Sequence, residues 1–200
     1  MLVEAGKRDL ISSVYELGKG IEDAHTLIYN GFVNNNERVI DEAEERIRKV
    51  KEEAARLSSE LLGSCGDDES LRAYCTLPSH FERMAANQEI MVRAIKTKIR
   101  ENLLFSDRAI TEINFIMNRL REIIDTLTDL ILARNTYTVK YLIESEKEIE
   151  RVASEYATLH EERLIEGICL PRSSGVYIMI LDSVKRIAWN VRAIAEKLMK

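Results

Sequence analysis

The 200-residue sequence predicts an all-α protein with six long helices, arranged as two tandem antiparallel three-helix bundles. Its composition favours helices, because good helix formers dominate and only 8 Gly and 2 Pro interrupt the chain. Apolar residues recur every three or four positions through most of its length. Three features of the first half also return in order in the second half. With 46% hydrophobic residues, a chain of this length can bury a sizeable core.

The first half predicts three helices, over residues 4–33, 37–62 and 70–103. Spacings of three and four give the first two helices one apolar face each. Their apolar stripes comprise Leu10, Val14, Leu17, Ile21, His25, Ile28 and Phe32, followed by Val39, Ala43, Ile47, Val50, Ala54, Leu57 and Leu61.

Turn and breaker residues separate these three helices. Asn34–Asn36 end the first helix and supply an N-cap for the second. Residues 63–68, rich in Gly, Ser and Asp, form the clearest loop of this half. Pro78 removes a backbone hydrogen bond, so we expect the third helix to break near Thr76–Leu77, with Ser79 capping the restarted helix.

The second half predicts three more helices, over residues 107–133, 137–166 and 173–199. Arg134–Thr136 form the first turn, and Gly167 and Pro171 bracket the second. The apolar stripes comprise Ile110, Ile113, Met117, Leu120, Ile124, Leu127 and Ile131, then Leu142, Ile149, Val152, Tyr156, Leu159 and Arg163, then Tyr177, Leu181, Val184, Ile187, Val191, Ile194 and Leu198.

The two halves align with each other at a nearly constant offset. The matching segments are residues 44–50 with 146–152 at an offset of 102, Asn34–Asn35 with Arg134–Thr136, and Arg83–Met84 with Arg186–Ile187 at an offset of 103. Three matches in the same order indicate an internal duplication. We therefore expect one domain over residues 1–200, with repeat one at 4–104 and repeat two at 105–200.

Net charge, cysteine spacing and hydropathy predict which partners and which cellular compartment suit this protein. A net charge of −5 argues against nucleic acid as the main partner, since phosphate neutralisation needs a basic face. Cys65, Cys75 and Cys169 lack zinc-like spacing, so we expect reduced thiols in a cytoplasmic protein. The charged N-terminal segment predicts no signal peptide, and no apolar run predicts a membrane span.

The sequence predicts no catalytic or cofactor-binding constellation. Gly18-Lys19-Gly20 lies in a helical stripe and lacks the rest of a phosphate-binding loop, and no Gly-x-Ser-x-Gly elbow occurs. His160 begins no His-Glu-x-x-His zinc motif, because the second His is missing. We therefore expect a protein that is not an enzyme, has no cofactor and has no dedicated metal site.

Three sets of residues keep a metal-binding alternative open. Glu22 and His25 form one Glu-x-x-His pair, of which a ferritin-type di-iron bundle needs two, so a core histidine is the preferred interpretation of His25. Two carboxylate pairs, Asp125 with Asp129 and Glu146 with Glu150, have the one-turn spacing that can share a metal ion. Such pairs are also typical of a solvated acidic helix face.

Trp189 allows two interpretations from sequence alone. Its position among the apolar residues of the last helix favours packing in the core or between helices. A tryptophan left exposed on that helix would instead suit an anchor for a partner.

The repeat architecture and two short motifs resemble the PhoU-like phosphate-uptake regulators. The motifs are Glu82-Arg83-Met84 on the third helix and Lys185-Arg186-Ile187 followed by Ile194-Ala195-Glu196 on the sixth. The resemblance covers the whole chain. Residues 160–181 look like the branch associated with sodium–phosphate or inorganic phosphate transporters.

The resemblance also shows where this sequence departs from the family. The family pattern places Glu-x-x-x-Asp on the third helix of each repeat to hold metal ions. Here Glu82 keeps one Glu position, but Ala86, Lys185 and Trp189 occupy the other three. An ammonium and an indole cannot replace carboxylates around a hard cation, so we expect no metal cluster at these positions. We expect the retained Arg83 and Arg186 to pair with acidic residues of a neighbouring helix.

The resemblance implies a non-enzymatic regulator of phosphate transport or phosphate-responsive signalling. Such a helical adaptor would dock on a phosphate transporter subunit or a sensor kinase, in the cytoplasm or peripheral to a membrane transporter. The long side faces of the bundle also suit a homodimer. The alternatives are a metal-binding helical bundle of ferritin type and a purely structural helical scaffold.

Overall fold

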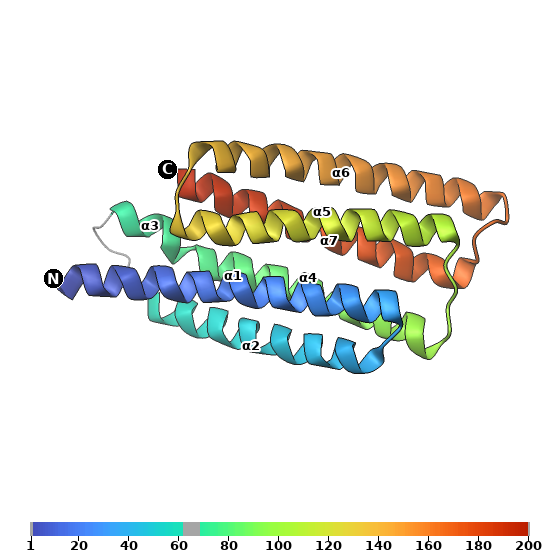
Figure 1. The fold of residues 1–200 in the computed structure, drawn as a ribbon, viewed down its shortest axis with the longest axis horizontal. Coiled ribbons are helices and arrows are strands. Elements are labelled where there is room, and N and C mark those ends of the chain that lie inside the picture. The colour runs from blue at the N-terminus through green and yellow to red at the C-terminus, as the bar shows by residue number, and fades with distance from the viewer. Residues whose placement is uncertain (1, 62–68, 200) are drawn as a thin grey trace.

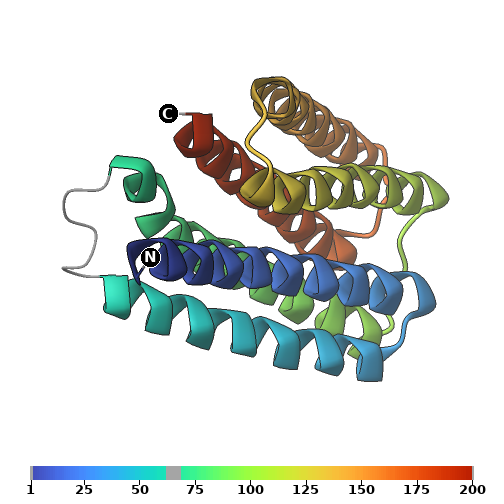
Figure 2. The same ribbon diagram turned by 60° about the vertical axis from the view of Figure 1, so that its left-hand side comes forward.

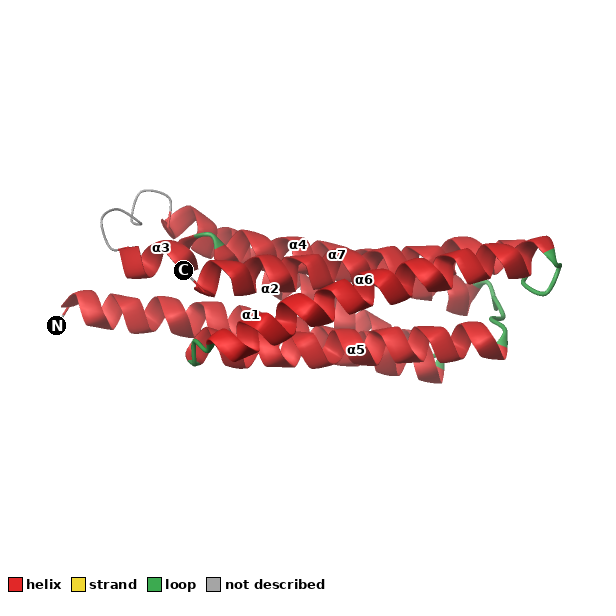
Figure 3. Cartoon of the chain, turned by 90° about the horizontal axis from the view of Figure 1, so that it is seen from above, coloured by secondary structure: helices red, strands yellow, loops and turns green. Residues whose placement is uncertain are grey.

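The computed structural model describes residues 2–61 and 69–199 and is helical throughout, with short connections and no strand in those ranges (Figures 1 and 3). The predicted all-α class is confirmed, and the third predicted helix is divided into a short and a long piece. The helices are α1 (Leu2–Asn34), α2 (Glu37–Leu61), α3 (Glu69–Cys75), α4 (Leu77–Arg100), α5 (Asp107–Leu132), α6 (Thr136–Ile165) and α7 (Pro171–Met199).

The long helices form two groups of three that lie side by side. Helices α1, α2 and α4 pack against one another, and so do α5, α6 and α7. Figures 1 and 3 show the two groups with their long axes roughly aligned, and Figure 2 shows the α5–α6–α7 group lying above the α1–α2–α4 group. The groups meet where α1 lies along α5 and α4 lies along α7. Because the third and sixth long helices meet, the two motif-bearing helices are neighbours.

A single apolar core runs through both groups. It includes large, fully buried side chains from the first half, such as Ile21 and Phe81, and from the second half, such as Ile113. Buried polar side chains also link helices inside this core. His25 Nε2 donates to the carbonyl oxygen of Met117 at 2.9 Å, which ties α1 to α5. The core therefore holds the two groups together as well as each group by itself.

Residues with special backbone or capping roles end the helices close to the predicted positions. Asn35 takes a positive φ of 48°, and the Asn36 side chain accepts from the backbone of Val39 at 3.4 Å, as expected for this turn. Asn135 caps α6 by accepting from Tyr137 at 2.8 Å. Gly167 ends the α6 region with a φ of 73°, a conformation that glycine adopts without strain.

The predicted break at Pro78 is confirmed. Helix α3 ends at Cys75, and Thr76 is the N-cap residue of α4. Pro78 falls in the first turn of α4, where its missing N–H would have had no helical partner. The predicted cap at Ser79 is wrong, because Ser79 lies inside that turn and its hydroxyl donates to the Thr76 carbonyl oxygen. The predicted loop at residues 63–68 lies outside the described residues.

The cysteines differ in state. Cys75 is disulfide-bonded, whereas Cys169 is a free, buried thiol. The expectation of three reduced thiols is therefore wrong for Cys75. Cys65 lies outside the described residues. In the ranges that are described, no helix has an apolar stretch long enough to cross a bilayer.

Gly20 allows α1 and α2 to approach closely. A Cβ atom at this position would overlap with Cγ2 of Val50, whose branched side chain has little rotameric freedom. Gly20→Ala should lower the free energy of unfolding by about 1–3 kcal/mol through overpacking, measured by urea denaturation. Gly175→Ala is the control, since a Cβ atom there would have no neighbour within 4 Å. It should stabilise α7 by about 0.5–1 kcal/mol, and equal effects at both sites would contradict the packing argument.

Candidate functional site

The motif residues of α4 and α7 line one open groove. The structure places Arg83 and Arg186, which lie in the two halves of the sequence, in the wall of a groove of about 570 Å³. The groove is lined by Arg83 and Asn87 of α4, Glu150 of α6, and Asp182, Lys185, Arg186, Trp189 and Asn190 of α7. It is thus built mainly from the two helices that the internal repeat relates.

The groove repeats one local arrangement on its two main helices. The Asn87 side chain donates to the Arg83 carbonyl oxygen at 2.7 Å, and the Asn190 side chain donates to the Arg186 carbonyl oxygen at 2.8 Å. Each pair is separated by one helical turn, and the two pairs are 103 positions apart in the sequence. The Arg-x-x-x-Asn pairs of both repeats therefore converge on the same groove.

The charges in the groove differ from those of the chain as a whole. Its lining holds three cationic and two acidic side chains, whereas the whole chain has a net charge of −5. Lys185 pairs with Asp182 at 3.2 Å. Arg83 and Arg186 are accessible in the groove, and neither forms an ion pair with any described residue. The expectation that these arginines pair with a neighbouring helix is therefore wrong, and their guanidinium groups remain available to a ligand.

His80 holds Asn190, one of the residues that line the groove. It is buried, and its Nδ1 lies 3.0 Å from Oδ1 of Asn190. Because an amide oxygen only accepts, Nδ1 carries the proton and donates. Burial lowers the pKa of His80, although this hydrogen bond opposes the shift. Both polar atoms of Asn190 are therefore engaged, which holds the asparagine and the adjoining turn of α7 in place.

Trp189 is 51% exposed at the edge of the groove. Ile187, Ala188 and Val191 occupy the buried positions of this part of α7, which leaves Trp189 on the outer face. Trp189 is therefore not a core residue, and of the two predicted kinds of packing only the one between helices, toward His80 of α4, is retained. Its ring lies 6.3 Å from the His80 ring of α4, between centroids, so one side of the indole faces the neighbouring helix.

The family's carboxylate positions do not come together in the groove. Glu82 is exposed and is not part of its lining, Ala86 has no ligating atom, and Lys185 is held by Asp182. Among the residues that the structure describes, no group of three or more His, Cys, Asp or Glu side chains is arranged to hold a metal ion.

The other candidate ligands from the sequence do not come together in one site within the part of the chain that the structure describes. Glu22 pairs with Lys19 at 2.5 Å, while His25 is fully buried and bonds to a backbone carbonyl. Glu146 is buried and pairs with Arg192 at 3.2 Å. The Asp125 and Asp129 side chains lie on an exposed face of α5. The ferritin-type alternative therefore loses the Glu22–His25 pair on which it rested.

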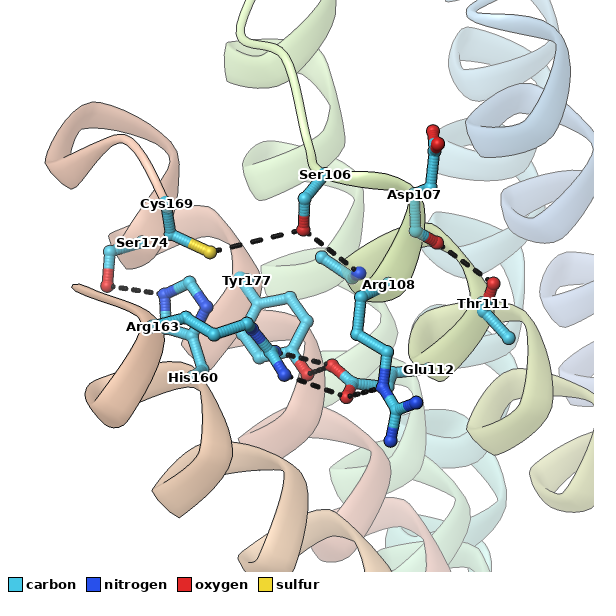
Figure 4. A network of polar contacts seen from close by, with 11 residues as sticks. Ser106, Asp107, Arg108, Thr111, Glu112, His160, Arg163, Cys169, Ser174 and Tyr177 are labelled. Atoms are coloured by element: carbon cyan, nitrogen blue, oxygen red, sulfur yellow. Dashed lines mark hydrogen bonds and ion pairs between the residues drawn. The ribbon is translucent and has the colours of Figure 1, made fainter. Parts of the chain in front are cut away.

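A second polar cluster surrounds Glu112 on α5. This carboxylate is 2% exposed and accepts hydrogen bonds from three side chains (Figure 4). The Arg163 guanidinium of α6 donates at 3.0 and 2.7 Å, and the Tyr177 hydroxyl of α7 donates at 2.6 Å. Arg108 adds a fourth bond at 3.0 Å. The carboxylate is therefore saturated with donors and fastens α5, α6 and α7 together.

The surroundings of this cluster are partly apolar. His160 stacks on Tyr177 with 4.4 Å between ring centroids, and its Nε2 lies 2.9 Å from Oγ of Ser174. Both rings line a small cavity of about 200 Å³, together with Cys169. Burial and the hydrogen bond to Glu112 raise the pKa of Tyr177 far above its usual value, so the hydroxyl remains a donor at neutral pH. The cluster can clamp three helices, and its carboxylate has no free lone pair for general-base chemistry.

Glu112 is not among the candidates predicted from sequence, although two residues in apolar stripes point to a buried acceptor. Arg163 falls in the apolar stripe of its helix, and a cation in such a position needs a buried counterion. Tyr177, also in a stripe, needs a partner for its hydroxyl. Those two residues indicate a buried acceptor without identifying which carboxylate supplies it.

Comparison with known proteins gives a match in structure only. No family model matches the sequence, and no curated protein does so either. The structure is similar to PhoU from Pseudomonas aeruginosa, with a TM-score of 0.88 and 15% identity, over 98% of this chain and 96% of that one.

A second solved structure, the phosphate transport system regulatory protein PhoU from Streptococcus pneumoniae, gives a TM-score of 0.85. It is 12% identical, over 98% of this chain and 94% of that one. The chain therefore has the fold of these PhoU proteins over nearly its entire length, and the expected PhoU-like architecture is confirmed.

Proposed function

We propose that this protein is a non-enzymatic regulator of phosphate transport, acting as a helical adaptor on a phosphate transporter subunit or a sensor kinase. The observation that carries this proposal is the shared fold with proteins named as phosphate transport regulators, over nearly all of both chains. The motif residues Arg83 and Arg186 add support, because both lie in one accessible groove. The adaptor works in the cytoplasm, at the inner side of a membrane transporter.

Trp189 is the residue that we assign to partner docking. Tryptophan and arginine are the side chains most often found at the energetic centres of protein interfaces. Here a half-exposed tryptophan lies beside Arg186, and both line a groove large enough for a partner's side chains. A partner that covers the indole would stabilise the complex by removing this apolar surface from water.

Deletion of the gene in its own host should change phosphate uptake, and the wild-type gene should restore it. Uptake of radiolabelled phosphate under low and high external phosphate measures this effect. In the same strains, the tagged wild-type protein should co-purify a phosphate transporter subunit or a sensor kinase after crosslinking. Unchanged uptake, together with no such partner in either condition, would favour the purely structural scaffold.

Trp189→Ala should reduce this co-purification by about tenfold or more, as expected when an interface anchor is truncated. Tyr137→Ala is the matched control, since Tyr137 is an aromatic side chain that is 83% exposed and lies on α6, outside the groove. Circular dichroism should show the same helix content for both variants. Equal retention of the partner by both would place the docking surface elsewhere.

Light scattering of the purified protein tests the homodimer that we also propose.

A further inference from the structure

We propose that the α4–α7 groove is a binding site for a phosphate-type oxyanion, held between Arg83 and Arg186. This inference rests on the proposed function for its biological meaning and goes beyond it, because it gives the regulator a ligand of its own. The argument for binding uses only the side chains that line this groove and those bonded to them.

The two arginines supply the donors that an oxyanion needs. Each guanidinium is a planar fork of N–H groups that matches the oxygens of phosphate, and its charge does not depend on pH. Arg83 and Arg186 line the same groove from opposite repeats, and neither is neutralised by an ion pair within the described chain. By contrast, Arg46, Arg48, Arg56 and Arg119 all have carboxylate partners.

The remaining charges set what the groove accepts. Lys185 adds a third cation near the arginines, but Asp182 partly neutralises it. Glu150 and Asp182 also lie in the lining, so they repel an anion that approaches from their side. A tetrahedral oxyanion offers paired oxygens that match the planar N–H fork of each guanidinium, whereas a spherical chloride ion accepts hydrogen bonds without this bidentate match. The groove therefore favours phosphate over a simple halide.

The two asparagines, one of them bonded to His80, are held against the backbone of the helix turns that carry the arginines. Each asparagine bonds back to the carbonyl oxygen of the arginine one turn earlier on its helix, at 2.7 Å on α4 and 2.8 Å on α7. Asn190 is fixed further by buried His80. A ligand therefore meets two helix turns that need little reordering when it binds, which lowers the entropic cost of binding.

Trp189 makes this site directly observable. It is the single tryptophan of the chain and lines the same groove, so fluorescence excited selectively from tryptophan rather than from the tyrosines reports on the groove. It also separates two sources of the ligand. Free inorganic phosphate would use only the charged groups, whereas a phosphate ester on a larger molecule would bring a group that can cover the indole.

The test is a fluorescence titration of the full-length protein with inorganic phosphate, at constant ionic strength maintained with sodium chloride. We expect a saturable change of the Trp189 signal with a Kd on the order of 1 mM. Isothermal titration calorimetry provides a second readout that does not depend on the indole. Phenyl phosphate is the second probe, and tighter binding of this ester than of inorganic phosphate would identify a phosphate ester as the source.

Arg83→Gln and Arg186→Gln should each weaken binding by about tenfold, and the double variant should abolish it. Arg93→Gln is the matched control, because Arg93 is an exposed arginine of α4 outside the groove. No saturable signal with either probe, by fluorescence or by calorimetry, would overturn the inference. So would equal binding by the double variant and the wild type. These assays use purified protein, so a failure to bind phosphate would not contradict the proposed regulatory function. Likewise, unchanged uptake or absent co-purification in the host would not contradict phosphate binding.

Discussion

Replacing Glu112 with alanine should lower the free energy of unfolding by about 3–5 kcal/mol, the largest loss expected from any single polar substitution in this chain. The reason is that Arg163, only 13% exposed, would keep its charge while losing both of its bonds to the carboxylate. The buried Tyr177 hydroxyl would lose its acceptor as well. Urea denaturation at pH 7, followed by circular dichroism, measures the change.

Two further variants separate the buried pair from charge in general. Glu122→Ala removes a carboxylate from the same helix, but its pair with Arg119 is accessible to water, so stability should change by less than about 0.5 kcal/mol. Tyr177→Phe removes one donor and should cost about 1–2 kcal/mol. A loss below about 1 kcal/mol for Glu112→Ala would show that the Arg163 guanidinium can reach water when its partner is absent.

Acid should destabilise the protein by about 2 kcal/mol between pH 7 and pH 5 through His25 alone. Burial lowers the pKa of His25 from 6.5 to about 4, although the bond to Met117 opposes this shift. The unfolded chain therefore takes up a proton at a higher pH than the folded one. Stability is complete above about pH 6.5 and falls as the pH drops toward 4. Urea denaturation at a series of pH values measures this slope.

His25→Gln provides the control for this effect. Glutamine does not titrate, and its amide N–H can still donate to the carbonyl oxygen of Met117. The variant should therefore lose the His25 part of the slope. His80 and His160, whose pKa values burial also lowers, leave a smaller slope of the same sign. An unchanged slope in His25→Gln would show that groups other than His25 set the acid sensitivity.

The sequence predicts the helices well because their ends carry strong local signals. Five of the predicted helices have ends within two residues of those observed, where Asn34–Asn36, Asn135 and Gly167 mark the turns. Pro78 likewise marks the break before α4. These signals act between residues that are close in the sequence, so no tertiary contact is needed to read them.

The candidate sites are less predictable because they depend on contacts between distant segments. Glu112 is a single acidic residue between Ile110 and Ile113, and its main partner lies 51 positions further along the chain. Arg83 and Arg186 align in the internal repeat, but the repeat does not predict that they share a groove without acidic partners. Periodicity favours the core for Trp189 because it cannot separate this residue from its buried neighbours. In each case tertiary packing decides which atoms meet.

The paired arrangement on α4 and α7 has a consequence for how any ligand of the groove is oriented. Arg83 and Asn87 correspond to Arg186 and Asn190, so each main helix contributes the same pair of residues to the groove. Those four residues alone would not distinguish the two ends of a ligand. Glu82 and Ala86, however, correspond to Lys185 and Trp189, and only the latter two line the groove. The groove thus has the same Arg-x-x-x-Asn pair on both main helices but Lys185 and Trp189 on α7 only, so a bound ligand would meet different residues at its two ends.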